Sequence, residues 1–308
     1  MYYFIVNPQS SSGLGIKEWA IVKEELAKQN VLYQAYFTEY MGHAIKLAKQ
    51  ICTENEGIKN IVVLGGDGTI NEVINGIDRY SEVLLGYIPS GSSNDLARSL
   101  NIPRDPLEAL AHILKPTKFK YLDHGIMSFP GLDLAPRKFS CSSGIGYDAN
   151  VCNEVQSSPL KKSLNHFHLG KFVYYLITIK QIVTLKNMSA TIIVDGVRKE
   201  SYNGFVFACN MIHKYEGGGL MMAPDADPTD GKLSICLVHD LKRLQCFMLL
   251  PTIIKGSHVK HKNVETFNCS EIEIITSEVT SIHTDGEIPA VYSHIKVSCL
   301  PEQMRMIL

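Results

Sequence analysis

The residues that most directly indicate chemistry form a glycine turn with one carboxylate, Gly65-Gly66-Asp67-Gly68-Thr69. An apolar run over 58–64 precedes the turn and a helical pattern over 70–77 follows it, which predicts a strand, a turn and a helix. Backbone N–H groups and the helix dipole at such a turn favour a bound phosphate, and glycine lets the chain approach it closely. The turn lacks the Gly-Lys-Ser/Thr of a Walker A loop and the Gly-x-Gly-x-x-Gly of a dinucleotide fingerprint.

Asp67 introduces an electrostatic conflict, because a carboxylate inside a phosphate-binding turn repels its ligand. A divalent cation between the two groups removes the conflict, and Mg²⁺ takes oxygen ligands from carboxylates and phosphates alike. The alternative is that these residues only connect a strand to a helix. We favour a phosphate and a magnesium ion because Asp-Gly-Thr follows the glycine pair.

A second polar turn, in IPSGSSNDLARSL at 88–100, again follows a strand pattern and begins a helix pattern. Its polar residues could cap the helix or face a ligand, and capping alone accounts for only one of them. They are Ser92, Ser93, Asn94 and Asp95. Two such turns at successive strand ends predict the ligand cleft of a doubly wound sheet.

The elements that must position these turns alternate regularly in the first third of the chain. Strand patterns cover 2–6, 31–38, 58–64 and 84–88, and helix patterns cover 16–29, 42–54, 70–77 and 94–100. This alternation predicts a parallel, doubly wound α/β domain with helices on both faces of its sheet.

After about residue 122 the pattern becomes β-rich. Strands are predicted over 139–143, 190–194, 197–202, 205–210, 233–238, 272–277 and 279–283, and helices near 167–185 and 243–255. Asp-Gly pairs at 195–196 and 230–231 indicate hairpins. The fold class is therefore α/β plus β, with a C-terminal β-sandwich-like domain.

The bulk composition excludes several classes of protein. Thirty basic against thirty-one acidic residues give a net charge of −1, which disfavours a nucleic-acid binder. The eight cysteines form no Cys-x-x-Cys pair, which favours buried thiols in a reducing compartment. The apolar segment 166–185 is interrupted by two lysines, and the start MYYFIVNP matches a strand better than a signal peptide. We expect a cytoplasmic protein without a transmembrane segment.

The motifs along the chain resemble the diacylglycerol kinase catalytic family, particularly its soluble bacterial lipid-kinase branch. They are NP…SSG at 7–13, GGDGT at 65–69, GSSNDLAR at 91–98, YLDHG at 121–125, APDADPTDGKL at 223–233 and TDGE at 284–287. GGDGT alone is shared with distant phosphofructokinases and NAD kinases, whereas the whole set is typical of lipid kinases such as sphingosine and ceramide kinases. The resemblance implies ATP as phosphate donor with Mg²⁺.

The resemblance also implies a nucleotide site. Its residues are Asn7, Ser11, Ser12, Gly13, Thr38, Gly65, Gly66, Asp67, Gly68, Thr69, Asn71, Glu72, Gly91, Ser92, Ser93, Asn94, Asp95 and Asp123. Ser92 stands where the family usually has threonine, and because it keeps the hydroxyl we expect binding to survive. Asp67, Asp95 and Asp123 resemble the carboxylates that hold magnesium through water.

For catalysis, the resemblance implies that Glu287 is the general base, with Asp285 nearby and Asp67 at the nucleotide. A lipid hydroxyl that attacks the γ-phosphorus must lose its proton, and a carboxylate can accept it. Without the other motifs, Asp-Gly-Glu would more simply be a β-turn.

A second, structural magnesium site is implied at Asp227, Asp230 and the backbone of Lys232. Carboxylates at this spacing in a loop can surround one ion. An ordinary hairpin turn is an equally good explanation of the pattern. Asp227 stands where relatives often have serine, and this change should strengthen a cation site.

The resemblance finally sets the expected domains and partners. Residues 1–122 and about 291–308 form the nucleotide-binding domain, because IKVSCLPEQMRMIL resembles the family's returning strand and tail. Residues 123–290 form the lipid-binding domain, and the substrates meet in an interdomain cleft. We expect docking at a membrane surface, with Lys161, Lys162 and Lys171 as candidates for contact unless they form a solvated basic loop. A homodimer is a further expectation.

The leading hypothesis is a kinase that phosphorylates diacylglycerol to phosphatidic acid. Other lipid alcohols, such as phosphatidylglycerol, a sphingoid base or undecaprenol, stay open as acceptors. NAD kinase is a weaker alternative, because the Ser-Ser-Asn-Asp segment fits lipid kinases better. A nucleotide-binding regulator without catalysis is disfavoured by the intact Asp67, Asn94, Asp95 and Glu287.

Overall fold

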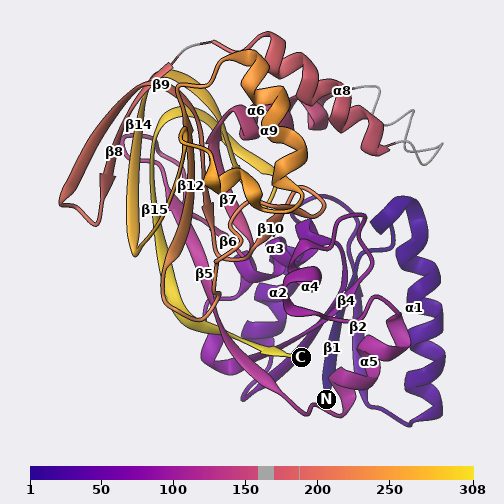
Figure 1. Ribbon diagram of the computed structural model, residues 1–308. Coiled ribbons are helices and arrows are strands. Elements are labelled where there is room, and N and C mark those ends of the chain that lie inside the picture. Colours follow the sequence, from indigo (N-terminus) through magenta and orange to yellow (C-terminus); the bar gives the residue numbers. More distant parts are fainter. Residues whose placement is uncertain (159–169, 187) are drawn as a thin grey trace. The chain divides into compact units, whose positions relative to one another are not determined.

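The computed structural model describes residues 1–158, 170–186 and 188–308 (Figure 1). It divides into two compact units. Unit 1 comprises Met1–His124, Gly217–Gly219 and Leu300–Leu308, and unit 2 comprises Gly125–Glu216 and Leu220–Cys299. Lys161 and Lys162 lie outside the described residues, and the Lys171 side chain is not described.

Unit 1 contains a parallel sheet in the order β2-β1-β3-β4, followed by the end of β15. Its strands are β1 (Tyr2–Val6), β2 (Tyr33–Phe37), β3 (Lys59–Gly65) and β4 (Val83–Pro89), with β15 (Glu287–Ile307) contributing Met306 opposite Leu85. The strand order reverses at β1, which has β2 on one side and β3 on the other. The predicted doubly wound α/β domain is confirmed.

Helices cover both faces of this sheet. On one face, α1 (Ser10–Lys28) and α5 (Pro106–Leu114) share an apolar core with alternate residues of β1 and β3, as Figure 1 shows for the helices. Elsewhere α2 (His43–Glu54) packs on α3 (Asp67–Gly76), and these helices contact β1 and β3. The buried residues of α2 fall at 44, 47, 48 and 51, the spacing of one helical face. The unit also contains η1 (Tyr80–Glu82) and α4 (Asp95–Leu100).

Unit 2 is β-rich, as predicted. Its main strands are β6 (Arg137–Phe139), β7 (Ser142–Gly146), β8 (Met188–Val194), β9 (Arg198–Met211), β12 (Leu233–His239), β13 (Val264–Cys269), β14 (Glu271–Thr284) and most of β15. The strand β5 (Phe119–Ser128) enters the unit from unit 1 and pairs with β6. The pairs β5–β6, β7–β9, β7–β14, β8–β9, β8–β14, β9–β12, β12–β13 and β14–β15 are antiparallel.

Two long strands correct the sequence prediction, which split each of them in two. β9 pairs with β8 through its first half and with β7 through its second half. β14 likewise pairs with β8 over 272–276 and with β7 over 282–284, with an irregular register opposite β15 between them. The predicted breaks are therefore places where a continuous strand changes partner.

The Asp-Gly pairs behave differently from each other. Asp195 and Gly196 have φ of 51° and 70° and join β8 to β9 as a tight hairpin, as predicted. Asp230-Gly231 precedes β12 and joins no paired strands, so the second predicted hairpin is wrong. The small hairpin in this region is β10 (Tyr215–Glu216) with β11 (Leu220–Met221).

In the part of unit 2 that the structure describes, the helical elements are α6 (Tyr147–Ser157), α8 (Gly170–Val183), α9 (Arg243–Ile253) and η2 (Ser257–Lys260). Among the described residues, no helix combines the length and the apolar composition that a membrane crossing requires.

Candidate functional site

The first candidate site residues lie where the order of the parallel strands reverses. β1 ends just before Asn7, and its neighbour β3 ends at Gly65. The Asn7 side chain donates to the Thr69 hydroxyl at 3.0 Å, which ties the two strand ends together. In doubly wound sheets, ligands bind outside the carboxyl ends of the strands at this reversal.

The two glycine turns pack directly against each other. A Cβ added to Gly91 would lie 2.5 Å from the Gly66 Cα, and one added to Gly66 would lie 3.1 Å from the Gly91 Cα. Asn94 braces the second turn, because its side chain accepts from the Gly91 N–H and donates to the Gly91 carbonyl, both at 2.8 Å. Glycine is therefore required for the close approach of the two turns.

Asp67 and Asp95 are brought together at the start of α4. Asp67 accepts from the backbone N–H groups of Asp95 at 3.1 Å and Leu96 at 3.3 Å, so its charge lies at the positive end of this helix. Asp95 accepts from the N–H of Gly218 at 2.8 Å. Sequence reasoning missed Gly218, although Gly217-Gly218-Gly219 was a visible signal and each has a positive φ.

The serines of the two loops also meet. The Ser10 and Ser90 hydroxyls lie 2.8 Å apart, and those of Ser11 and Ser92 lie 3.5 Å apart. The residues from Ser11 to Gly13 have positive φ and interrupt the first turn of α1, where a loop was predicted. The loop at 11–13 and the turn at 91–95 therefore form one surface with the GGDGT turn.

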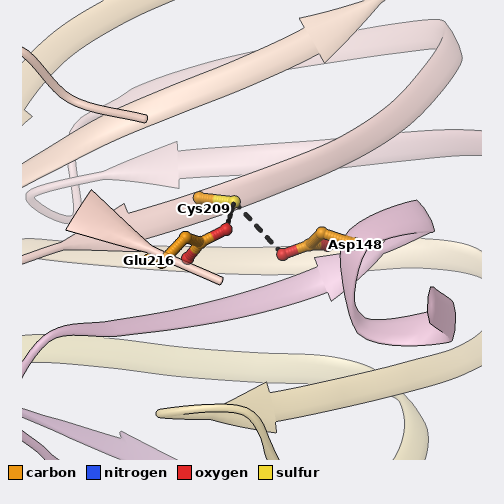
Figure 2. Close-up of side chains that lie close together, drawn as sticks. All are labelled: Asp148, Cys209 and Glu216. Atoms are coloured by element: carbon orange, nitrogen blue, oxygen red, sulfur yellow. Dashed lines mark hydrogen bonds between the residues drawn. The ribbon is translucent and has the colours of Figure 1, made fainter. Parts of the chain in front are cut away.

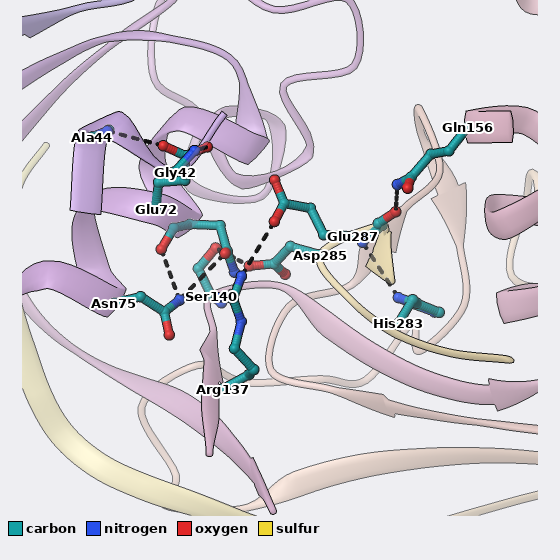
Figure 3. Close-up of polar contacts among 12 residues, drawn as sticks. Gly42, Ala44, Glu72, Asn75, Arg137, Ser140, Gln156, His283, Asp285 and Glu287 are labelled. Carbon is teal, nitrogen blue, oxygen red and sulfur yellow. Dashed lines mark hydrogen bonds and ion pairs between the residues drawn. The ribbon is translucent and has the colours of Figure 1, made fainter. Parts of the chain in front are cut away.

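Other predicted nucleotide residues have structural contacts in unit 1. The Glu72 carboxylate accepts from the N–H groups of Gly42 at 2.7 Å and Ala44 at 3.0 Å, and so caps α2 (Figure 3). The Thr38 N–H donates to the Val6 carbonyl at 2.9 Å. Asn71 is fully buried in α3.

Asp123 is also fully buried, and it belongs to the end of β5 that lies in unit 1. Its carboxylate accepts from the N–H of Glu302 at 2.7 Å, which ties the C-terminal segment to β5. In the structure, Asp123 therefore holds the C-terminal segment. The proposed contact of Asp123 with magnesium stays a prediction.

In unit 2, Asp285 and Glu287 flank the hairpin turn between β14 and β15. The Asp285 carboxylate accepts four hydrogen bonds, from the Ser140 N–H and hydroxyl and from the N–H groups of Cys141 and Ser142, at 2.7–3.0 Å. These bonds anchor the turn. Glu287 instead faces the Arg137 guanidinium at 3.3 Å, with both side chains about a quarter exposed (Figure 3).

The peptide of Gly286, between these carboxylates, is held on both sides. Its N–H donates to His283 Nδ1 at 3.3 Å, and its carbonyl accepts from the Gln156 side chain at 2.5 Å (Figure 3). Sequence reasoning missed Arg137, His283 and Gln156. Arg137 and Gln156 lie more than 100 residues from the turn, so no local signal could have shown their contacts.

Behind His283 lies a buried polar cluster. His283 Nε2 contacts the Asp148 carboxylate at 2.9 Å, and the Cys209 thiol donates to Asp148 at 3.1 Å and Glu216 at 3.5 Å (Figure 2). Burial raises the pKa of Glu216 to about 7 and that of Cys209 well above its usual value. Burial lowers the pKa of His283, but the carboxylates of Asp148, Glu216 and Asp285 together outweigh this effect and raise it. The cluster fixes the ring that contacts the Gly286 turn.

The residues of the second predicted magnesium site lie in an exposed loop of unit 2. Asp227 accepts from the N–H and hydroxyl of Thr229 at 3.0 and 2.7 Å, and Asp230 accepts from the Lys232 N–H at 2.9 Å. These contacts close two short turns. A cation at Asp227, Asp230 and Lys232 stays a prediction.

Glycine turns and carboxylates at the reversal of a parallel sheet, together with the β-rich unit, define a kinase fold of the kind that phosphorylates lipids. Residues 1–122 match the diacylglycerol kinase catalytic domain, and residues 141–308 match the YegS C-terminal NAD kinase beta sandwich-like domain. The chain belongs to the diacylglycerol kinase family, whose kinases use ATP, and it is a lipid-kinase-type phosphotransferase.

Similar proteins and structures agree with this assignment. The chain is 30% identical over 93% of its length to the candidate lipid kinase YtlR of Bacillus subtilis, covering 93% of that protein. It is 27% identical to a diacylglycerol kinase of Staphylococcus carnosus, over 95% of this chain and 91% of that protein.

Solved structures show the same fold. A crystal structure of a diacylglycerol kinase from Bacillus anthracis has a TM-score of 0.71 at 20% identity, covering 99% of this chain and 96% of that one. Yeast NADH kinase complexed with NADH has a TM-score of 0.52 at 11% identity, covering 99% and 82%. At these identities the likeness concerns the fold alone.

Proposed function

We propose that this protein transfers the γ-phosphate of ATP to the hydroxyl of a lipid, with diacylglycerol as the first acceptor to test and phosphatidic acid as its product. The observation that carries this proposal is the contact between the Gly66 and Gly91 turns, with Asp67 and Asp95 beside them. A glycine turn at the start of a helix can direct backbone N–H groups at a phosphate, which suits the phosphates of a nucleotide.

The residues beside these turns also fit a magnesium ion. Asp67 and Asp95 provide carboxylate oxygens, the ligands that Mg²⁺ prefers, and they are adjacent in the structure. When bound, Mg²⁺ neutralises negative charge on the β- and γ-phosphates. We propose that Asp67 and Asp95 hold it through water, and that Asn7, Ser11 and Ser92 orient the nucleotide.

Glu287 is the proposed general base. Its position after the turn, beside Arg137, leaves about a quarter of its side chain exposed, whereas four hydrogen bonds occupy Asp285. Glu287 would accept the proton of the lipid hydroxyl as the oxygen attacks phosphorus. Asp285 therefore acts in this proposal by positioning the turn.

The test is phosphate transfer from radiolabelled ATP to diacylglycerol in mixed micelles containing Mg²⁺. Asp67→Ala and Glu287→Gln should each lower kcat by about a hundredfold or more, because each removes a group that acts on the reacting phosphate or proton. Glu56→Gln and Asp133→Asn, at exposed positions, serve as matched controls and should retain wild-type activity.

The outcomes separate the alternatives. Wild-type activity in both Asp67→Ala and Glu287→Gln would contradict the assigned mechanism. Incorporation into phosphatidylglycerol, a sphingoid base or undecaprenol in preference to diacylglycerol would change the acceptor and keep the chemistry. Incorporation into NAD and into no lipid would overturn the lipid specificity.

A further inference from the structure

The helix α9 is unusual for a helix at a protein surface. It is rich in apolar residues, RLQCFMLLPTI, yet none of its eleven residues is buried. Leu244 and Met248 are 70% and 60% exposed, and Ile254, just beyond the helix, is 57% exposed. Because Leu244 and Met248 are four positions apart, they lie on the same face of the helix.

The opposite face of α9 is apolar as well. Leu249 and Ile253 pack partly buried against an apolar core of unit 2 that includes Phe207, Cys236 and Val238. A surface helix in water normally has one apolar stripe and a polar outer face. Among the residues of unit 2 that the structure describes, none buries the apolar outer face of α9.

The neighbouring helix α8 adds to this surface. The two helices pack together, as Figure 1 shows, and Arg243 donates to the Leu185 carbonyl at 3.3 Å just after α8 ends. Leu176, Ile179 and Val183 of α8 are each about half exposed, at 46%, 46% and 53%. Their spacing of three and four residues places them on one face of the helix.

The charge around α9 indicates what this surface binds. Residues 241–263 contain five Lys or Arg residues and no Asp or Glu, in a chain whose net charge is −1. Exposed apolar side chains flanked by basic ones fit an anionic lipid surface, where lysines and arginines meet headgroups and apolar side chains reach the acyl boundary. A two-fold contact between copies of this chain would instead bring two such basic segments together.

We propose that the outer faces of α8 and α9 dock on an anionic lipid bilayer. The proposed docking surface consists of Leu176, Ile179, Val183, Leu244, Met248 and Ile254. This inference rests on the proposed function to the extent that a lipid acceptor resides in a bilayer. It adds the part of the molecule that makes the contact, and the lipid charge that favours it.

The experiment is co-sedimentation of the whole protein with vesicles of phosphatidylcholine containing 30 mol% phosphatidylglycerol (a composition of roughly physiological anionic charge), without ATP. The double variant Leu244→Asp/Met248→Asp should bind at least tenfold more weakly than wild type. Val197→Asp/Met41→Asp is the matched control, because Val197 and Met41 are 88% and 84% exposed and lie outside the surface. This control should bind like the wild type.

A second arm tests the charge. Lys242→Gln/Lys255→Gln should lower affinity for the anionic vesicles by about twenty-five-fold, because each lost charge costs about fivefold. The same double variant should leave the weaker binding to pure phosphatidylcholine vesicles unchanged. Equal loss on both kinds of vesicle would overturn the assigned role of lipid charge.

Failure of this proposal is distinguishable from failure of the proposed kinase activity. If wild type and Leu244→Asp/Met248→Asp sediment equally, the docking surface is wrong, whatever the kinase assay shows. A wild-type dimer that this variant dissociates, without vesicle binding by either protein, would assign the surface to self-association and also overturn it. Vesicle binding that depends on Leu244 and Met248, without phosphorylation of any lipid, would support docking while removing the kinase function.

Discussion

Asp285 and Glu287 are two residues apart, yet the structure gives their carboxylates different surroundings. Asp285 is enclosed by donors from the segment 140–142, whereas the partly exposed Glu287 side chain faces the Arg137 guanidinium. At the scale of the residue, the motif Asp-Gly-Glu therefore combines a carboxylate that holds the turn, Asp285, with the proposed general base, Glu287. Replacing each carboxylate by the corresponding amide separates the two roles.

We predict that Asp285→Asn lowers both stability and activity, whereas Glu287→Gln lowers activity alone. An asparagine amide would point a donor at backbone donors and lose charge-assisted hydrogen bonds, which should cost about 3 kcal/mol or more. Thermal unfolding followed by circular dichroism, together with the kinase assay, measures both effects. A normal melting temperature for Asp285→Asn would show that the four hydrogen bonds do not stabilise the turn.

His283 provides a finer test, because its two ring nitrogens have different partners. In His283→Asn the amide oxygen can replace Nδ1 and accept from Gly286, whereas in His283→Gln the amide nitrogen can replace Nε2 and donate to Asp148. We predict that kcat falls at least tenfold in the Gln variant and only a few fold in the Asn variant, with the KM for ATP unchanged in both. Equal losses of kcat would mean that His283 does not position the Gly286 turn.

At the scale of the element, local patterns were sufficient for most of unit 1 and insufficient for the long strands of unit 2. Apolar periodicity predicted α2 closely, because four buried residues fall on one face. The sequence analysis predicted two strands, 197–202 and 205–210, where β9 is continuous through Gly204. A Cβ there would lie 2.3 Å from an Asp240 side-chain oxygen, so this glycine allows close packing inside a continuous strand and does not form a turn.

In the candidate site, too, local sequence predicted some features, whereas others depend on residues far away in the chain. The Gly65–Thr69 turn was predictable, because strand, glycines and helix are adjacent in the sequence. The capping of α2 by Glu72 and the anchoring of Asp285 were not, because their partners lie about 30 and 145 residues away. A motif identifies residues that act together, but tertiary contacts decide which carboxylate binds a ligand and which one holds the backbone.

The cap of α2 can be tested by a matched pair of substitutions. Glu72→Gln removes a charged acceptor from the N-terminal N–H groups of α2 and should destabilise unit 1 by about 1–2 kcal/mol. Glu54→Gln, at the exposed C-terminal end of the same helix, should be neutral or slightly stabilising, because a negative charge is unfavourable there. Trp19, the only tryptophan of the chain, is buried in unit 1 and reports its unfolding by fluorescence. Equal midpoints for the two variants would contradict the capping role.

At the scale of the whole molecule, two strands connect the units and carry site residues. β15 begins with Glu287 in unit 2 and ends beside β4 in unit 1, and β5 carries Asp123 in its first half. Chain continuity therefore links the proposed base to the parallel sheet through a single strand. Long-range pairings of this kind leave no local signal in the sequence, so the contacts between residues could not be predicted. The fold class could be predicted, because it follows from local apolar periodicity.

Stability of the whole chain should depend on pH through His258. This side chain is buried in η2, where one ring nitrogen contacts the Met222 carbonyl at 3.2 Å. The other ring nitrogen is buried and has no hydrogen-bond partner among the residues that the structure describes. Burial lowers the pKa of His258 below its usual 6.5. As pH falls below 6.5, the unfolded chain binds a proton that the folded chain does not, so folding is progressively disfavoured.

Urea unfolding of wild type and His258→Gln, followed by circular dichroism at pH 7.5 and 5.5 (values chosen to lie about one unit above and below the ordinary histidine pKa), measures this effect. The wild type should lose stability relative to the variant as pH falls, with a slope of up to about 1.4 kcal/mol per pH unit for one proton. His261→Gln, three residues away, controls for the loss of a histidine in the same segment and should parallel the wild type. If the difference in unfolding free energy between wild type and His258→Gln were the same at both pH values, His258 would bind its proton equally well in the folded and unfolded chains. That result would contradict the prediction.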